Sequence, residues 1–312
     1  MGNKILILGS CNVDLVFNIP RFHRPRETIL AESQATFFGG KGANQAVASK
    51  RLGGNVCFIT KVGNDLYGES YRQHLVKNGL DSNLILEDKK LPTGMAVIEL
   101  TPDGENRILV FPGANASLSE KNLKRLESCW RGVDVFVTQL EIPLPTVERG
   151  VRLAKDQGSL ILLNPSPPAQ LPPHFLSLVD FIVPNEMEAQ SLTGIKWKGD
   201  QDIRKMAEKL LNMGARNVVI TLGPKGLFFK NRSGELWMEA FRVKVMDTTA
   251  AGDAFLGGLA TGLAENKPIR EALRFANGAG ALATTKLGAQ PSLPFRKELE
   301  VFISKMRLQS KC

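Results

Sequence analysis

The chain has 312 residues, of which 43% are hydrophobic and 23% charged, and this composition excludes a disordered, collagen-like or coiled-coil protein. The net charge of +9 is spread along the sequence without the interleaved aromatic residues of a single-strand binder, so we expect an anionic small-molecule substrate and no nucleic-acid partner. No apolar run approaches the roughly 18 residues of a membrane span, and the four cysteines form no C-x-x-C pair. We therefore expect a cytosolic protein with reduced thiols and no membrane partner.

Short apolar stretches alternate with helical ones along most of the chain. The apolar stretches are rich in β-branched residues or Leu and are bounded by Gly, Pro or Asn, which is typical of strands buried on both faces. Their alternation with helices predicts a parallel sheet covered on both faces. The expected strands are Lys4–Gly9, Asn55–Val62, Val133–Gln139, Leu160–Asn164, Phe181–Pro184 and Asn217–Leu222. The expected helices are Ala43–Leu52, Tyr67–Asn78, Pro145–Gln157, Glu186–Thr193, Asp202–Met213, Ala251–Glu265, Ile269–Lys286 and Phe295–Met306.

Two regions, Asp14–Phe38 and Thr93–Val110, break this alternation because they contain strand-like residues and no helical pattern. The second has a Pro-Asp-Gly turn at positions 102–104, and the strand-like residues on either side of it predict a hairpin. We expect a single domain over residues 1–312, with a small β-sheet lid formed by residues 14–38 and 93–110. Such a sheet can close over a site, contact another subunit, or do both.

The segment Asp247–Gly257 is the most informative motif in the sequence. Ala250, Ala251 and Gly252 stand where a helix opens, and small residues there let an anion approach the unpaired backbone N–H groups. Asp253 follows in the first turn of that helix. It is either a charge that favours the helix start, or a base that accepts the proton of a hydroxyl attacking a bound phosphate.

A second motif, Phe38–Ala46, has two glycines before an expected helix and one glycine at its start. These glycines permit a tight turn and close approach of a ligand to the backbone. Lys41 and Asn44 can hydrogen-bond to hydroxyls, although a plain strand-to-helix turn is the alternative. The motif is not a Walker A loop, because glycine follows the lysine where that loop has Ser or Thr.

Polar residues also stand at the ends of three expected strands. Asn12 and Asp14 alternate after the first strand, so both face one side of the chain. Glu141 and the pair Asn185 and Glu188 follow later strands. Each alone suits a solvated strand end or a helix cap. Together they mark the carboxyl edge of a parallel sheet, where open α/β sheets bind ligands.

These motifs together resemble the ribokinase branch of the carbohydrate kinase family, which also holds fructokinases and adenosine kinase. The stretch Gly39–Ala46 is similar to the family's first signature, and Asp247–Gly257 is similar to its second. Further similar segments are Gly113-Ala114-Asn115-Ala116, Asn164-Pro165-Ser166, Pro184-Asn185-Glu186, Thr221-Leu222-Gly223 and Gly288-Ala289-Gln290-Pro291-Ser292. The resemblance runs from Gly9 to about Pro294.

The resemblance implies a doubly wound α/β fold with a mostly parallel sheet, helices on both faces, and a β lid that pairs with a second subunit's lid in a homodimer. It implies that Asp253 is the catalytic base, and that Ala250, Ala251 and Gly252 form an anion hole for the γ-phosphate of ATP. The residues that would hold the sugar hydroxyls are Asn12, Asp14, Gly40, Lys41, Asn44, Glu141 and Asp253.

The resemblance also implies sites for the nucleotide and for two cations. The nucleotide would lie along Asn185, Thr221, Leu222, Gly223, Pro224, Lys225, Gly226, Gly252 and Asn277. Glu188 would hold Mg²⁺ through water. An activating K⁺ ion would be bound by Asp247, Thr249, Thr284, Leu287, Ala289 and Ser292.

The activity implied is ATP-dependent phosphorylation of D-ribose at its 5-hydroxyl to give D-ribose 5-phosphate. Related substrates stay open, namely 2-deoxyribose, fructose or a nucleoside. Phe111-Pro112 precedes Gly113 in the expected lid strand that faces the sugar, and this bears on which sugar fits. A non-catalytic sugar-binding regulator on the same fold is a further alternative. A dehydrogenase is disfavoured, because no dinucleotide fingerprint follows the first strand and the Gly278-Ala279-Gly280 segment lies within an expected helix.

Overall fold

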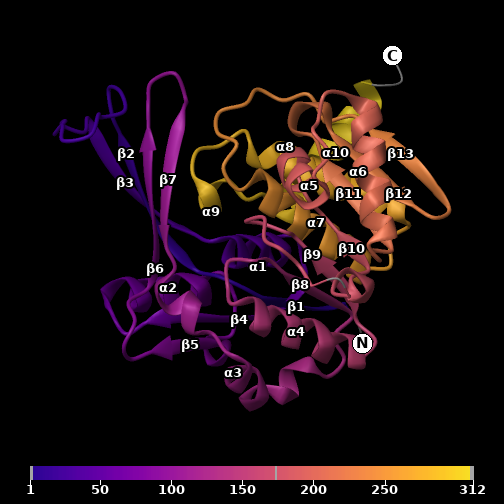
Figure 1. Cartoon of the computed structure of the whole chain (residues 1–312), viewed down its shortest axis with the longest axis horizontal. Helices are drawn as coiled ribbons and strands as arrows, with labels where there is room; N and C mark the ends of the chain where they lie inside the picture. Colours follow the sequence, from indigo (N-terminus) through magenta and orange to yellow (C-terminus); the bar gives the residue numbers. More distant parts are fainter. Residues whose placement is uncertain (1–2, 173, 310–312) are drawn as a thin grey trace.

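The computed structural model describes residues 3–172 and 174–309, and its larger sheet has nine strands in the order β13-β12-β11-β10-β9-β8-β1-β4-β5 (Figure 1). Every neighbouring pair from β11 to β5 is parallel, and β12 and β13 add an antiparallel hairpin at one edge. The predicted, mostly parallel sheet is therefore confirmed. The strands are β1 Lys4–Leu8, β4 Asn55–Gly63, β5 Ile85–Asp88, β8 Val135–Thr138, β9 Leu160–Leu163, β10 Phe181–Ile182, β11 Asn217–Thr221, β12 Leu227–Asn231 and β13 Gly234–Met238.

Helices cover both faces of this sheet, as the side chains of β1 show. Ile5 and Ile7 pack in one apolar cluster with residues of α1, α7 and α8, whereas Leu6 and Leu8 pack in a second cluster with residues of α4 and α6. Alternate residues of a strand point to opposite faces, so one apolar strand supplies two cores. The helices are α1 Lys41–Arg51, α2 Leu66–Lys77, α3 Glu120–Arg125, α4 Leu144–Asp156, α5 Glu186–Thr193, α6 Asp200–Asn212, α7 Ala251–Ala264, α8 Ile269–Ala283, α9 Ala289–Ser292 and α10 Arg296–Gln309.

The smaller sheet has four strands in the order β3-β2-β6-β7 and stands out from the main body at the upper left of Figure 1. Its central pair, β2 and β6, is parallel, and the two outer pairs are antiparallel. It forms from the two regions that broke the helix–strand alternation, so the predicted lid sheet is confirmed. Its strands are β2 Asn12–Asn18, β3 Ser33–Gly39, β6 Gly94–Leu100 and β7 Asn106–Phe111.

The sequence analysis did not predict every element. The hairpin of β12 and β13, the edge strand β5 and the short helices α3 and α9 were not expected, and α8 ends at Ala283, before the expected Lys286. Short 3-10 helices occupy Ser82–Leu84, Gly113–Ser117, Glu127–Trp130, Leu176–Leu178 and Gly223–Lys225.

Two other expectations concern membranes and thiols. Within residues 3–172 and 174–309, none of the helices is both long enough and apolar enough to cross a membrane. Cys11, Cys57 and Cys129 are free, and Cys312 lies outside the described residues.

Candidate active site

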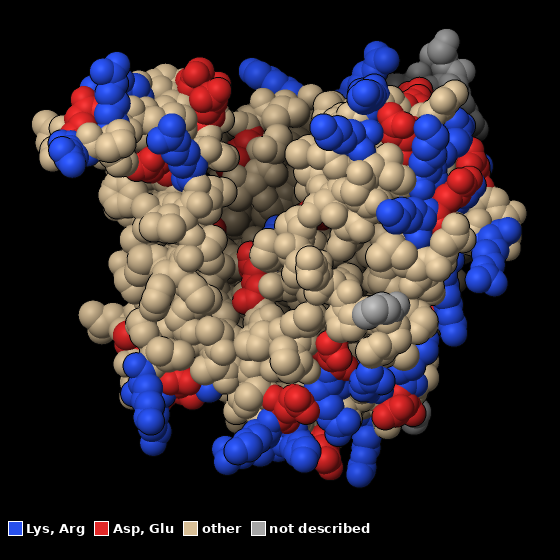
Figure 2. Space-filling view, viewed as in Figure 1, with Lys and Arg blue, Asp and Glu red and all other residues tan. Residues whose placement is uncertain are grey.

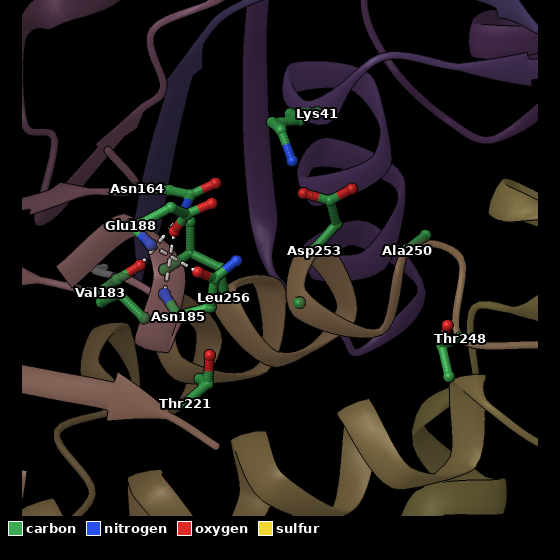
Figure 3. A pocket seen from close by; sticks show the side chains of 11 residues that line it. Lys41, Asn164, Val183, Asn185, Glu188, Thr221, Thr248, Ala250, Asp253 and Leu256 are labelled. Carbon is green, nitrogen blue, oxygen red and sulfur yellow. Dashed lines mark hydrogen bonds between the residues drawn. The ribbon is translucent and has the colours of Figure 1, made fainter. Parts of the chain in front are cut away.

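A cleft opens between the lid sheet and the main body, with acidic side chains on its wall, while lysines and arginines gather on the outer surface (Figure 2). It leads to a cavity of about 210 Å³ at the carboxyl ends of the parallel strands. The starts of α1, α5 and α7 all contribute to this cavity, and helix N-termini favour bound anions. Its lining residues are Lys41, Asn164, Val183, Asn185, Glu188, Thr221, Thr248, Ala250, Gly252, Asp253 and Leu256 (Figure 3).

Asp253 is buried in the first turn of α7, and two amides of α1 hold its carboxylate. Asn44 Nδ2 donates to Oδ2 at 2.9 Å, and Gln45 Nε2 donates to Oδ1 at 2.9 Å. Gln45 is in turn oriented by Gln139, whose Nε2 donates to Gln45 Oε1 at 2.5 Å. The sequence analysis did not assign a role to Gln45 or Gln139, although Gln45 stands within the first signature.

Lys41 begins α1, and its ammonium group points toward Asp253 across the cavity (Figure 3). Burial lowers the pKa of this ammonium. The carboxylates of Asp253, Glu141 and Glu188 outweigh that effect, so the pKa of Lys41 is raised overall. The side chain is therefore positively charged, and it lines the same cavity as Asn185 and Thr221, two of the residues expected around the nucleotide.

Asn12 and Asp14 lie together on β2, both buried, as their alternation predicted. Asn115 fixes the orientation of Asn12: its Nδ2 donates to Asn12 Oδ1 at 2.8 Å and to the carbonyl of Cys11 at 2.9 Å, and its Oδ1 accepts from the Cys11 N–H. Because Asn12 Oδ1 accepts from Asn115, the Asn12 amide nitrogen lies on the other side of that amide group, where it can donate. The sequence analysis placed Asn115 in a motif but assigned no role to it.

The Asp14 carboxyl is buried close to other carboxylates. Burial, then the charges of Glu141 and Asp253, raise its pKa to about 7. Glu141 Oε2 accepts from Ser10 Oγ at 2.5 Å and from the backbone N–H of Lys41 at 3.0 Å. Asn44 Oδ1 is buried and has no hydrogen-bond partner among the described residues. This side of the site thus offers acceptors that a polyhydroxylated ligand can satisfy.

Two glycines allow this close packing. A Cβ on Gly39 would lie 1.9 Å from Asp14 Oδ2. Gly40 has a φ of +84°, and a Cβ there would lie 2.6 Å from the backbone nitrogen of Asn12. A side chain at Gly39 would displace the Asp14 carboxyl group, and one at Gly40 would collide with the backbone of Asn12.

The residues expected around the nucleotide begin in the cavity and extend to the surface. Asn185 caps α5: its Oδ1 accepts from the Glu188 N–H at 2.8 Å, and Glu188 Oε2 accepts from the Asn185 N–H at 2.9 Å. Burial raises the pKa of Glu188. Thr221 bridges to Asn185 at the end of β11.

The later members of this set lie outside the cavity wall. Gly223, Pro224 and Lys225 are exposed, and Leu222 and Gly226 are buried beneath them. Asn277 on α8 donates to the carbonyl of Glu239 at 2.7 Å.

The expected anion hole lies where α7 begins. Ala250 adopts a left-handed conformation, with φ 59° and ψ 9°, immediately before the helix. Ala250 and Gly252 line the cavity, while the N–H of Ala251 is hydrogen-bonded to the carbonyl of Thr248 at 3.2 Å. A phosphate that takes all three N–H groups would have to displace that long bond.

The residues expected to bind K⁺ lie on two segments that Asp247 joins. Its Oδ1 accepts from the Thr249 N–H and its Oδ2 from the Gly288 N–H, both at 2.8 Å. The carbonyl of Thr284 accepts from the backbone N–H of Asp247 at 3.2 Å. Ser292 Oγ donates to the carbonyl of Ala289 at 2.7 Å, and the side chain of Leu287 is exposed. The structure brings this set into one neighbourhood.

Comparison with known proteins agrees with this geometry. The model of the pfkB family of carbohydrate kinases matches residues 3–296. The ribokinase of Haemophilus influenzae is 40% identical over 303 residues, covering 97% of this chain and 99% of that one. The solved ribokinase of Thermotoga maritima, 34% identical, superposes with a TM-score of 0.88 and covers 97% of this chain and 100% of that one.

A ribokinase from Arabidopsis thaliana, solved with ribose and ATP, is 29% identical and superposes with a TM-score of 0.90 over 97% of this chain and 99% of that one. The match to the family model spans both signatures, the lid strands and the sheet edge that carries the cavity. The chain belongs to the pfkB family of carbohydrate kinases.

Proposed function

We propose that this enzyme transfers the γ-phosphoryl group of ATP to the 5-hydroxyl of D-ribose, giving D-ribose 5-phosphate and ADP. One observation carries the proposal: the buried carboxylate of Asp253 lies between the polar cluster of Asn12 and Asp14 and the cavity at three helix starts. A base in that place can reach a sugar hydroxyl on one side and a phosphate on the other. The ribokinase relatives support the choice of ribose.

In the proposed reaction, Asp253 accepts the proton of the 5-hydroxyl as its oxygen attacks the γ-phosphorus. The bond between that phosphorus and the oxygen bridging to the β-phosphate breaks, and ADP leaves with the electron pair. The Lys41 ammonium and the N–H groups at Ala250 and Gly252 stabilise the charge on the transferring group. Asn44 and Gln45 hold Asp253 in one orientation, so little reorganisation is needed during transfer.

Two acceptors support the sugar assignment. Asn44 Oδ1 is buried without a hydrogen-bond partner among the described residues, and the Asp14 carboxyl is buried near the charges of Glu141 and Asp253. Sugar hydroxyls would supply donors to both groups. A site built in this way selects a polyol over an analogue that lacks a hydroxyl. Closure of the lid sheet would keep out water, which would otherwise accept the phosphate.

Mg²⁺ and the nucleotide belong on the opposite side of the cavity. Glu188 lines the cavity with a buried carboxylate whose pKa is raised, first by burial, even though it accepts a hydrogen bond from the Asn185 N–H. A carboxylate and an amide oxygen are ligands that suit a hydrated Mg²⁺, so Asn185 and Glu188 fit such an ion. When bound with ATP, the ion neutralises phosphate charge. The run from Thr221 to Gly226, with Asn277, is proposed to border the nucleotide. Its exposed part would face the adenosine of ATP at the protein surface.

A homodimer and a cytosolic location also belong to this proposal. The edge strand β7 exposes Ile108, Leu109, Val110 and Phe111, each about half exposed or more. An uncovered apolar edge strand favours pairing, and a two-fold contact between two lids would cover it. Light scattering at micromolar concentration tests this point, and a fully active monomer would contradict it.

The activity is tested by following ATP consumption with D-ribose, 2-deoxyribose, fructose and a nucleoside, with the Asp253→Asn variant as the inactive control. We expect the largest kcat/KM for ribose and a phosphorus NMR signal of a 5-phosphate. A larger kcat/KM on another member of the panel would reassign the substrate. Sugar binding by calorimetry without any ADP formation would identify a regulator instead.

A further inference from the structure

A chain of hydrogen bonds runs behind the sugar-side turn and ends on the Gly39 carbonyl. The fully buried hydroxyl of Tyr71, on α2, donates to that carbonyl. Gln290, on α9, donates from Nε2 to Tyr71 Oη at 3.0 Å, and its Oε1 lies 2.7 Å from His74 Nε2. An amide oxygen can only accept, so the contact with Gln290 requires the tautomer in which His74 Nε2 carries the hydrogen, although Asn78 Nδ2 also lies 3.3 Å from that nitrogen. In that tautomer all three hydrogen bonds run in one direction.

Stacking, burial and hydrogen bonds hold the side chains of this hydrogen-bond chain in place. The ring of Phe38 stacks on Tyr71, with centroids 4.7 Å apart, and on His74, with centroids 4.4 Å apart. Gln290 is fully buried, and Arg51 Nη1 donates to its backbone carbonyl at 2.7 Å. Fixed partners on each side make the Tyr71 hydroxyl a rigid donor.

The group that receives this hydrogen bond lies at the sugar site. Gly39 is the last residue of β3 and pairs with Asn12. The peptide linking Gly39 to Gly40 is planar, so fixing its carbonyl toward Tyr71 sends the Gly40 N–H to the opposite side, away from α2. Glu141 accepts from the next N–H, that of Lys41. The turn is therefore held at both ends, by Tyr71 before Gly40 and by Glu141 after it.

We propose that Tyr71, oriented by Gln290, is a positioning residue for sugar binding, which fixes the Gly39–Gly40 peptide so that the turn fits the sugar. This inference rests on the proposed function, because it concerns the sugar of that reaction. Neither residue lines the cavity at Asp253, so their effect reaches the sugar through the backbone of the turn. We therefore expect the effect to fall on the sugar and not on ATP.

The test is Tyr71→Phe, which keeps the stacked ring and removes only the hydroxyl. We expect the KM for ribose to rise about 3- to 10-fold, while kcat and the KM for ATP stay within about twofold, because the lost contact acts on sugar binding throughout the reaction. The matched control is Tyr67→Phe, the same chemical change at an exposed position on the same helix, which should alter neither constant.

A second variant, Gln290→Glu, places an acceptor where Nε2 donates, so the Tyr71 hydrogen is drawn from Gly39 toward the new carboxylate. Its KM for ribose should rise as in Tyr71→Phe. The double variant should match the single Tyr71→Phe variant within about twofold, because no hydroxyl is left to redirect. Each protein is checked by circular dichroism, and if Tyr71→Phe does not fold, Gln290→Glu decides alone.

The outcomes separate this inference from the proposed function. A wild-type enzyme that phosphorylates ribose, with an unchanged ribose KM in Tyr71→Phe, overturns the positioning role alone. Equal rises in the KM for ribose and for ATP also overturn it, since they indicate a general structural effect. If the wild-type enzyme prefers another sugar, the proposed substrate fails and the same comparison is read on that sugar. A wild-type enzyme that phosphorylates no sugar overturns both.

Discussion

The two halves of the site are built in different ways. On the proposed sugar side, Asn12, Asp14 and Asn44 are each at most 9% exposed, and hydrogen bonds with neighbouring side chains fix Asn12 and Asn44. On the proposed nucleotide side, Gly223, Pro224 and Lys225 are exposed. A small polyol has few features to distinguish it, so its site needs several fixed polar groups. A triphosphate carries concentrated charge, which helix starts and one ammonium can bind without a closed pocket.

The largest expected effect tests the group where the two halves meet. Asp253→Asn keeps the shape of the side chain and its place in the wall, and removes the base. We expect kcat to fall by roughly 10²- to 10⁴-fold, the usual contribution of a positioned acid–base group. Nucleotide affinity, measured by calorimetry, should stay within a few-fold. Near-normal turnover would show that Asp253 is only a charge at the start of α7.

A second experiment asks whether the buried, ionised carboxylate of Asp14 lowers the free energy of unfolding. The pKa of Asp14 is raised to about 7 in the folded protein by burial and then by Glu141 and Asp253, against an ordinary value of 3.8. The native state therefore binds more protons between about pH 4 and 7, and the free energy of unfolding falls as pH rises through that range.

Asp14→Asn removes this cost and should raise Tm at pH 8 by several degrees, an effect on the order of 2–4 kcal/mol. The difference in Tm between variant and wild type should shrink as pH falls toward 4. Thermal unfolding of both proteins from pH 4 to 8, without ligand, measures it. A Tm difference that does not change with pH would place the Asp14 carboxylate in a solvated or compensated environment.

The third prediction tests whether the two halves of the site bind their ligands independently. Asp14→Ala removes an acceptor for sugar hydroxyls and should weaken ribose binding by about 1–3 kcal/mol, with ATP binding unchanged. Calorimetry with each ligand measures both affinities on one preparation. Parallel losses for ribose and ATP would mean that the two halves are not independent, or that the variant is misfolded.

The sequence alone was sufficient to locate elements that have a characteristic residue pattern within a few positions. The apolar strand at Lys4–Leu8, the glycines before α1 and the small residues at the start of α7 are each readable within a few positions. Their place at one sheet edge followed from the parallel topology. The roles of the residues in the candidate site came from family resemblance, and they stay predictions until variants are measured.

The roles of some residues left no local signal, even where the residues lie within a motif. Asn115 orients Asn12 from 103 residues away, and Gln45 holds Asp253 from 208 residues away. A buried amide has the same local pattern whether it supports a catalytic group or a loop, so only the folded chain separates these cases. The hairpin of β12 and β13 was missed for a related reason: its antiparallel strands follow β11 directly and interrupt the strand–helix order on which the topology was argued.

The smallest expected effect concerns the K⁺ site beside the anion hole. Asp247 links the segment before α7 to Gly288, so a cation bound by its carboxylate and nearby carbonyls would steady the backbone that carries Ala250 and Gly252. K⁺ would then act by preorganising N–H groups for the transition state, without touching ATP. The alternative is that Asp247 only joins the two segments through its hydrogen bonds.

Activity is therefore compared at fixed ionic strength in tetramethylammonium, Na⁺ and K⁺ salts. We expect K⁺ to raise kcat or lower KM several-fold, and the smaller Na⁺ to do less. Asp247→Ala removes both backbone hydrogen bonds as well as the charge, so a loss of activity in that variant has two possible causes. The informative quantity is the ratio of activity in K⁺ to that in tetramethylammonium, which should fall toward one in Asp247→Ala. Equal wild-type activity in all three salts would refute the cation site and leave Asp247 as a structural link.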